Sequence, residues 1–318
     1  MEILFVKRIG YGILQIDVTN KCNLRCWFCR RDKLKRDTLT LEILKDIFIK
    51  AKGFGFTVLN VSGGEPLLRP DIVEILKVAK KYFKEVTITT NGTVPIPEEV
   101  FKYTDLVQVS IDGDEKVHEA NRGVEGIYQK ILRNLRSKRE KNVVVKTVYF
   151  KQDTNSLIRL GKDIEGLVKY WSIRPIIKKG IIITRQEFFE LLGKLSQHVN
   201  VDIISEDPIY ITYLKLDDIK DGIGGCIAGW GGLYMNSQGE IYPCAYLPIK
   251  LGDVFEEGLD FWEIFENPVM KSLRNRNGFK NCGQCSMINL CGGCRAIAYL
   301  NTGDYLAKDP RCNYEYSL

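Results

Sequence analysis

The sequence predicts an α/β protein that is built on a partial (β/α)6 barrel of the TIM type and carries a small cysteine-rich C-terminal domain. Through the first two-thirds of the chain, short runs rich in valine, isoleucine and threonine alternate with amphipathic helical segments. Repeated βα units imply parallel strands wrapped by helices, and six of them suit an open barrel. The ten cysteines fall into two groups, at residues 22–29 and 226–312.

Each barrel element has a local signal. Six apolar segments bounded by Gly, Asn or Asp are predicted strands: residues 13–18, 57–62, 86–90, 106–111, 143–150 and 170–177. Helices are predicted between them at 41–51, 71–83, 116–138 and 154–168, and another near 185–198. The first of these helices has Thr38 or Thr40 as its N-cap.

Composition bounds the domains and the compartment. A chain of 318 residues, 45% hydrophobic, can form one large and one small core. Glycine, cysteine and aromatic residues become frequent from residue 222, so we expect a core at 1–185, a connector at 186–221 and a C-terminal domain at 222–318. No run of 18 apolar residues and no signal peptide is present, which predicts a cytoplasmic protein without a membrane partner.

The charge pattern gives no nucleic-acid signal. The net charge is +6, but basic residues are spread among acidic ones, and the densest run, at 133–141, is typical of a solvated helix end. A nucleic-acid surface should show clustered basic residues with interleaved aromatics. We therefore expect no nucleic-acid partner.

Polar segments follow four successive predicted strands, where a barrel of this kind places its active site. A cysteine loop follows the first strand and Ser-Gly-Gly-Glu-Pro, at 62–66, follows the second. Thr-Asn-Gly-Thr at 90–93 follows the third, and Ser-Ile-Asp-Gly at 110–113 ends the fourth. Each segment alone is an ordinary turn signal. Their common position predicts that all four converge on one site.

The cysteine loop has the spacing C-x3-C-x2-C at Cys22, Cys26 and Cys29. Three thiolates on one short loop can hold three irons of a cubane cluster and leave the fourth iron without a protein ligand. An open position of this kind is usual for a catalytic centre. Many cysteines in a cytoplasmic chain favour metal over disulfides. A zinc loop or three buried thiols stays an alternative.

Together, C-x3-C-x-aromatic-C and Gly-Gly-Glu-Pro resemble the radical S-adenosylmethionine (SAM) superfamily over residues 13 to about 180. The resemblance implies an oxidoreductase in which SAM chelates the open iron. An electron from the reduced cluster cleaves SAM to a 5′-deoxyadenosyl radical, which abstracts hydrogen from the substrate. A low-potential donor such as a ferredoxin or flavodoxin would supply the electron.

The same resemblance implies roles for eight residues around SAM: Phe28, Gly63, Gly64, Glu65, Asn91, Ser110, Asp112 and Arg122. Phe28 would lie near the adenine, although a packing aromatic is the alternative. The two glycines would let the backbone approach the methionine amino group, with Glu65 as its acceptor. The polar residues after the third and fourth strands would meet the ribose or methionyl end. Arg122 would pair with the carboxylate, unless it is a solvated arginine.

The seven rear cysteines resemble the SPASM extension of radical SAM enzymes, which holds two auxiliary [4Fe-4S] clusters. The matching pattern is Cys226, Gly239, Cys244, Cys282, Cys285, Cys291, Cys294 and Cys312. The resemblance assigns an outer cluster to Cys282, Cys285, Cys291 and Cys312, and an inner one to Cys226, Cys244 and Cys294. The inner cluster then lacks a fourth cysteine, and a non-cysteine ligand or open site is expected. Only two residues separate Cys291 from Cys294, where the family usually has three, so a displaced Cys294 outside the inner cluster is the alternative.

Two features of the sequence bear on the substrate. The tail at 294–312 resembles SPASM proteins of haem maturation and tungsten-cofactor modification, and also enzymes that modify ribosomal peptides. The cysteine loop lies too near residue 1 for a preceding peptide-recognition domain, which favours a cofactor or tetrapyrrole substrate over a peptide or protein. A non-catalytic electron-transfer protein and a zinc-binding module are the alternatives of other classes. No catalytic base is assigned, because core or surface roles fit Tyr213, Tyr234, Tyr242 and Asp253 better.

Overall fold

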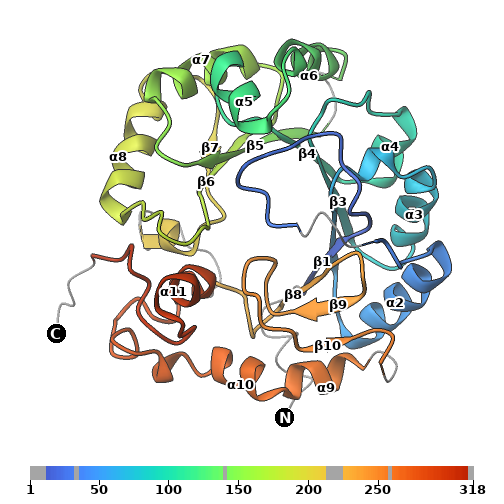
Figure 1. Ribbon diagram of the computed structural model, residues 1–318, viewed down its shortest axis with the longest axis vertical. Helices are drawn as coiled ribbons and strands as arrows, with labels where there is room; N and C mark the ends of the chain where they lie inside the picture. The colour runs from blue at the N-terminus through green and yellow to red at the C-terminus, as the bar shows by residue number, and fades with distance from the viewer. Residues whose placement is uncertain (1–11, 32–35, 139–141, 213–224, 257–259, 314–318) are drawn as a thin grey trace.

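The structure is a computed structural model that describes residues 12–31, 36–138, 142–212, 225–256 and 260–313. Its strands form one sheet in the order β10-β9-β8-β1-β2-β3-β4-β5-β6-β7. Figure 1 shows the strands curving inside a ring of helices, with the C-terminal segment, orange to red, at one end of the ring. This arrangement is the predicted α/β partial barrel with a cysteine-rich C-terminal region.

The six predicted strands are confirmed, each with ends within two residues of its expected bounds. They are β1 (Ile13–Asp17), β2 (Val58–Ser62), β3 (Glu85–Thr90), β4 (Leu106–Ser110), β5 (Val143–Tyr149) and β6 (Trp171–Pro175). All neighbours from β1 to β6 pair in parallel. A short strand that was not predicted, β7 (Ile203–Ile204), adds to β6 in the same direction.

The helices that cover the strands are α2 (Leu41–Phe54), α3 (Ile72–Ala79), α4 (Glu98–Tyr103), α5 (Glu115–Arg122), α6 (Ile127–Arg136), α7 (Thr154–Ile164) and α8 (Arg185–Ser196). Thr40, one of the two expected N-caps, accepts a hydrogen bond from the backbone of Ile43. The single helix predicted at 116–138 is wrong. Gly123 and Gly126 have φ of +71° and +73°, and this left-handed backbone divides the segment into α5 and α6.

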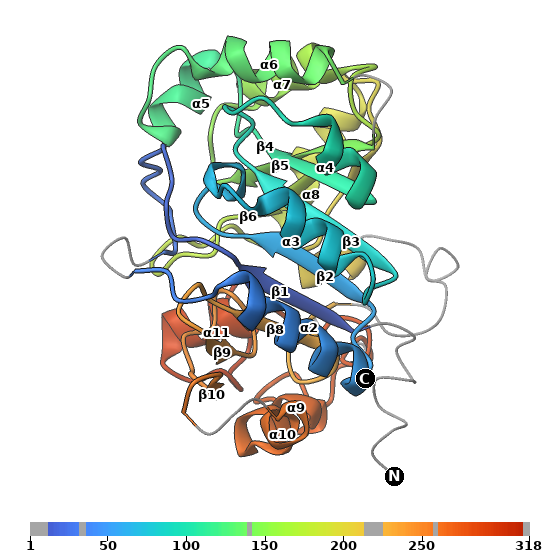
Figure 2. The same ribbon diagram turned by 90° about the vertical axis from the view of Figure 1, so that its right-hand side faces the viewer.

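The C-terminal region shares the sheet with the barrel. Its strands are β8 (Gly232–Met235), β9 (Glu240–Tyr242) and β10 (Gly252–Asp253), and its helices are α9 (Phe261–Glu266), α10 (Pro268–Arg274) and α11 (Arg295–Thr302). Strand β8 pairs in parallel with β1, with Gln15 opposite Tyr234, and Figure 2 shows this region packed beside β1. Three short 3-10 turns complete the described elements: η1 (Pro66–Leu68), η2 (Pro208–Thr212) and η4 (Arg276–Gly278).

Two further observations bear on the expectations from the sequence. The predicted connector contains α8 and β7, which continue the alternation of helix and strand, so the boundaries at 185 and 222 stay a prediction. Within the described ranges, no helix has the length and apolar character needed to cross a membrane.

Candidate functional site

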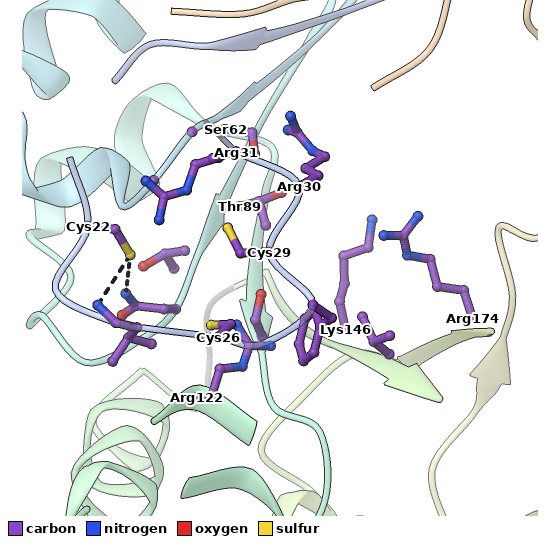
Figure 3. A pocket seen from close by; sticks show the side chains of 18 of the residues that line it. Cys22, Cys26, Cys29, Arg30, Arg31, Ser62, Thr89, Arg122, Lys146 and Arg174 are labelled. Atoms are coloured by element: carbon purple, nitrogen blue, oxygen red, sulfur yellow. Dashed lines mark hydrogen bonds between the residues drawn. The ribbon is translucent and has the colours of Figure 1, made fainter. Parts of the chain in front are cut away.

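A cavity of about 240 Å³ opens where strands β1 to β6 end. Nine of the residues expected at a site line it: Cys22, Cys26, Phe28, Cys29, Gly63, Gly64, Asn91, Ser110 and Arg122. The three cysteine side chains lie on one side of this cavity, and Arg122 lies beside Cys26 (Figure 3). The four polar segments that follow successive strands therefore meet at one site, as the barrel topology requires.

The paired glycines, Gly63 and Gly64, hold the start of the cysteine loop, just before Cys22. The backbone N–H of Gly64 donates to the carbonyl of Thr19 at 2.7 Å, and that of Glu65 donates to the carbonyl of Lys21 at 2.8 Å. A Cβ on Gly63 would lie 2.4 Å from the Thr19 oxygen, and one on Gly64 would lie 2.0 Å from the Lys21 oxygen. Only glycine permits this close approach, which fixes the loop just before Cys22.

The middle of the cysteine loop is held by the end of α5. The backbone N–H of Arg25 donates to the carbonyl of Arg122 at 2.9 Å, and the Trp27 indole N–H donates to Oδ1 of Asn121 at 2.8 Å. Cys26 lies between these two contacts. The helix end thus places the middle of the loop over the cavity.

The thiols of the loop already have donors directed at them. The Leu24 backbone N–H lies 3.4 Å from Sγ of Cys22, and Nδ2 of Asn91 lies 3.9 Å from the same sulfur (Figure 3). Nη1 of Arg122 lies 3.8 Å from Sγ of Cys26. Burial raises the pKa of Cys26, and the Arg122 charge opposes that rise. Donors and a cation beside free thiols suit anionic, metal-bound thiolates.

Glu65 does not line the cavity, contrary to its expected role as an acceptor for a ligand's amino group. Its carboxylate is fully buried and accepts from Oγ1 of Thr90 at 2.7 Å, from the N–H of Asn91 at 2.6 Å and from the N–H of Leu67 at 3.1 Å. Burial raises its pKa, and these hydrogen bonds oppose the rise. The carboxylate instead fixes the turn that presents Asn91.

Asp112 is also buried completely and does not line the cavity, although a direct ligand contact was expected. Oδ2 accepts from Nε of Arg122 at 2.7 Å and Oδ1 accepts from the N–H of Val148 at 3.1 Å. Its own N–H donates to Nδ1 of His118 at 3.1 Å. Burial lowers the pKa of His118 to about 3, and the Arg122 charge acts in the same direction. Arg122 is therefore not a solvated arginine but a buried, ion-paired one.

Sequence reasoning missed the cationic side of the cavity. Lys146 on β5 and Arg174 on β6 line the side of the cavity that lies opposite Cys22 (Figure 3). Nζ of Lys146 lies 2.6 Å from a carboxylate oxygen of Glu206, and Arg174 donates to the Tyr246 hydroxyl and stacks on its ring. Both charged residues stand within predicted strands, and this position is the signal from which the sequence could have indicated a cationic side of the cavity.

The tyrosines considered as bases have other partners. The Tyr234 hydroxyl donates to Oδ2 of Asp17 at 2.7 Å and accepts from Nη1 of Arg30, and burial raises its pKa. Tyr242 donates to Glu240 at 3.0 Å. Lys250 lies 3.2 Å from Asp253, and Tyr213 lies outside the described residues.

The rear thiols influence one another's pKa values. Burial raises the pKa of Cys282, with Cys312 and Cys285 adding to the rise, and it raises that of Cys291 to about 12, with Cys312 again adding. Burial also raises the pKa of both Cys244 and Cys294, and there the adding thiol is Cys226. The backbone N–H of Cys226 donates to the carbonyl of Cys291 at 3.1 Å, so the assignment of each rear cysteine to one cluster stays a prediction.

The surroundings of the rear thiols fit anionic clusters. Two guanidinium nitrogens of Arg295, Nε and Nη2, are buried without a hydrogen-bond partner among the described residues, and the Arg295 charge lowers the pKa of Cys282. All ten cysteines are free thiols. In the described part of the chain, no three Cys, His, Asp or Glu side chains are gathered closely enough to hold one metal ion.

Comparisons with known proteins agree with this geometry. Residues 16–157 match the radical SAM superfamily, and residues 226–294 match an iron–sulfur cluster-binding domain, SPASM. An AdoMet-dependent heme synthase of Methanosarcina barkeri is 29% identical over 94% of this chain and 95% of its own length. The subtilosin biosynthesis protein AlbA of Bacillus subtilis is 23% identical over 92% of this chain and 69% of its own.

A solved structure has the same fold. SuiB of Streptococcus suis, bound to S-adenosylmethionine, superposes with a TM-score of 0.78 over 98% of this chain and 80% of its own, at 20% identity. The same protein is also known bound to the precursor peptide SuiA. At this level of identity the likeness concerns the fold.

Proposed function

Because the chain belongs to the radical SAM superfamily and carries a SPASM domain, we propose that it is a maturase acting on a tetrapyrrole with carboxylate side chains. The observation that carries this proposal is the charge of the cavity. Its described lining contains five cationic side chains, Arg30, Arg31, Arg122, Lys146 and Arg174. Three of them have a carboxylate partner, which is Asp17, Asp112 and Glu206 respectively for Arg30, Arg122 and Lys146, so cations remain in excess. A cavity of this charge favours a polyanionic substrate.

The front of the cavity would hold the reactive cofactors. Cys22, Cys26 and Cys29 would ligate a [4Fe-4S] cluster, because their thiols share one wall of the cavity. This cluster, when bound and reduced, supplies the electron that cleaves SAM into methionine and the 5′-deoxyadenosyl radical that takes hydrogen from the substrate.

The protein's own residues would orient SAM. The backbone of Gly63 and Gly64, at the cavity wall, offers polar groups to the methionine end, while Phe28 offers a face to the adenine. Arg122 would bind the carboxylate, and Asp112 would act through Arg122 by fixing its guanidinium. Glu65 would act indirectly too, through Asn91. Ser110 would contact the ribose or methionyl end from the strand end of β4.

The rear cysteines would hold two auxiliary clusters with the ligand sets expected from the sequence. The proximity of Cys294 to Cys226 supports its place in the inner set, which then has three cysteines. A low-potential ferredoxin or flavodoxin of the cytoplasm would supply electrons. No membrane or nucleic-acid partner is required by this proposal.

The tetrapyrrole is also supported by the relatives. The heme synthase of M. barkeri matches 94% of this chain and 95% of its own length, so nearly all of that relative has a counterpart here. The similarity to AlbA, a bacteriocin biosynthesis protein, supports the alternative that the chain modifies a ribosomally made peptide.

An anaerobic assay separates these functions. The protein is reconstituted with iron and sulfide, reduced with dithionite and incubated with SAM and either iron tetrapyrroles bearing propionates or a precursor peptide. We expect the tetrapyrrole to stimulate 5′-deoxyadenosine formation and to change in mass. Stimulation by the peptide alone would favour the alternative. Three [4Fe-4S] clusters contain about twelve irons, and about eight of these belong to the two auxiliary clusters. Bound zinc in place of those eight irons would contradict the proposal that the rear cysteines hold auxiliary clusters.

A further inference from the structure

Arg295, the first residue of α11, is a buried cation whose counter-charge is missing among the described side chains. The residue is 1% exposed. Its Nη1 donates to the carbonyls of Tyr305 and Ala307, at 3.1 Å and 2.8 Å, and its guanidinium stacks 4.4 Å above the ring of Phe279. Among the described residues, neither Nε nor Nη2 has a hydrogen-bond partner. The Arg295 charge acts on Asp304, but that carboxylate is partly exposed and already paired with Lys280 at 2.6 Å. Burying an unpaired charge is strongly unfavourable.

A second arginine in the same region shows how this chain pairs a buried cation. Arg311 is likewise 1% exposed, and it forms ion pairs with Asp207 at 2.7 Å and Asp309 at 2.8 Å. Both carboxylates are themselves buried. Arg295 has no such buried pair among the described side chains, which leaves its two free nitrogens available to a counter-charge that is not a side chain.

The cysteines around Arg295 indicate what that counter-charge is. Arg295 stacks on the ring of Phe279, and the carbonyl of Phe279 accepts a hydrogen bond from the backbone N–H of Cys282 at 3.1 Å. The backbone also makes room for the guanidinium, because a Cβ on Gly293 would lie 2.7 Å from Nη2. Gly293 lies between Cys291 and Cys294 and has φ of +56°. The two free nitrogens are thus buried within the cysteine-bearing segment.

We propose that Arg295 donates through Nε and Nη2 to sulfur of the outer auxiliary cluster and raises the reduction potential of that cluster. This inference rests on the cysteine ligands proposed above. Net charge, hydrogen bonds to sulfur and solvent exposure set such potentials. A buried guanidinium that is not neutralised by a carboxylate favours the reduced, more negative cluster. Its two N–H donors act in the same direction.

The test is a redox titration of the full-length reconstituted protein, followed by electron paramagnetic resonance. SAM is added to identify the front cluster by the change in its signal. Arg295→Gln removes the charge, Arg295→Lys keeps it without the planar fork, and Lys280→Gln is the control. Lys280 carries the same charge on the segment before Cys282, but it is 69% exposed and paired with Asp304.

We expect Arg295→Gln to make the one-electron reduction constant of one auxiliary cluster tenfold smaller, which lowers its midpoint potential by about 59 mV. Arg295→Lys should give a smaller shift of the same sign, and Lys280→Gln less than a twofold change. Unchanged potentials in Arg295→Gln with full iron, or equal shifts in all three variants, would overturn the proposal.

If a variant fails to bind an auxiliary cluster, its iron content shows which role Arg295 has. Loss of about four irons in Arg295→Gln, with full iron in Arg295→Lys, supports a counter-charge role. Loss in both variants shows a packing role instead and overturns the proposal. A wild-type protein with only about four irons would contradict the rear ligand sets proposed above, which is a separate failure.

Discussion

Arg122 and Asp112 form a buried ion pair behind the cysteine loop, with 2.7 Å between Nε and Oδ2. The exposed fractions of the two side chains are 9% and 0%. The pair leaves Nη1 of the arginine 3.8 Å from Sγ of Cys26. A carboxylate that does not line the cavity thus determines where the cation of the proposed SAM site lies.

Asp112→Asn should weaken SAM binding by about tenfold, or about 1.4 kcal/mol, because Arg122 loses the charge that fixes it. The free energy of unfolding should fall by about 3 kcal/mol, since an unpaired charge stays buried. Titration calorimetry and urea unfolding measure these effects. Asp46→Asn is the control, since its ion pair with Lys50 is exposed. A lower stability with unchanged SAM affinity would reduce Asp112 to a packing role.

Gly64→Ala should prevent assembly of the front cluster. The new Cβ would lie 2.0 Å from the Lys21 carbonyl oxygen, so the start of the cysteine loop has to move. Iron analysis should show a loss of about four irons per chain. Gly193→Ala in α8 is the matched control, because nothing lies within 4 Å of its Cβ. That variant should be neutral or more stable by about 0.5–1 kcal/mol. Full iron in Gly64→Ala would contradict the account.

A feature could be predicted from the sequence when the residues that form it lie close together along the chain. Strands β1 to β6 and the cap at Thr40 rest on local patterns, and these were predicted. The pairing of β8 with β1 joins residues more than 200 positions apart and has no local signal. Local motifs also cannot show side-chain direction. Glu65 stands in a motif next to the site, but its carboxylate points into the protein.

His118 should make stability depend on pH. Its pKa in the folded protein is about 3, against an ordinary 6.5, because burial disfavours the charged form. Below pH 6.5 the histidine takes up a proton in the unfolded chain but not in the folded protein. The free energy of unfolding is therefore highest above pH 6.5 and falls as the pH is lowered from 6.5 toward 3. Between pH 7.5 and 5.5 the loss should be about 1.4 kcal/mol for this one proton. Urea unfolding of wild type and His118→Asn measures it.

The His118→Asn variant should lack this part of the pH dependence, because asparagine does not titrate. Its side-chain oxygen can still accept a hydrogen bond from the Asp112 N–H, as Nδ1 of His118 does. His198→Asn is the control. His198 is the only other histidine of the chain and it is exposed. An equal pH dependence in wild type and His118→Asn would show that His118 does not titrate in this way.

Lys146→Met and Arg174→Met should each raise the dissociation constant of a propionate-bearing tetrapyrrole about tenfold, because each removes a cation from the cavity. Absorbance titration with the oxidised protein measures this. The dissociation constant of SAM should stay within twofold, since both side chains lie on the side of the cavity opposite Cys22 (Figure 3). Glu206→Gln removes the one described acid of the lining and should not weaken tetrapyrrole binding. Weaker binding in that variant would argue against charge as the determinant.

The central claim is that the loop of Cys22, Cys26 and Cys29 holds the cluster at which SAM is cleaved. The most direct measurement is 5′-deoxyadenosine formed by the dithionite-reduced, reconstituted protein, compared with Cys26→Ala. We predict equal amounts of 5′-deoxyadenosine and methionine from the wild type, with about twelve irons per chain. Cys26→Ala should form none while it keeps about eight irons. Formation of 5′-deoxyadenosine by Cys26→Ala, or none by a fully loaded wild type, would contradict the account.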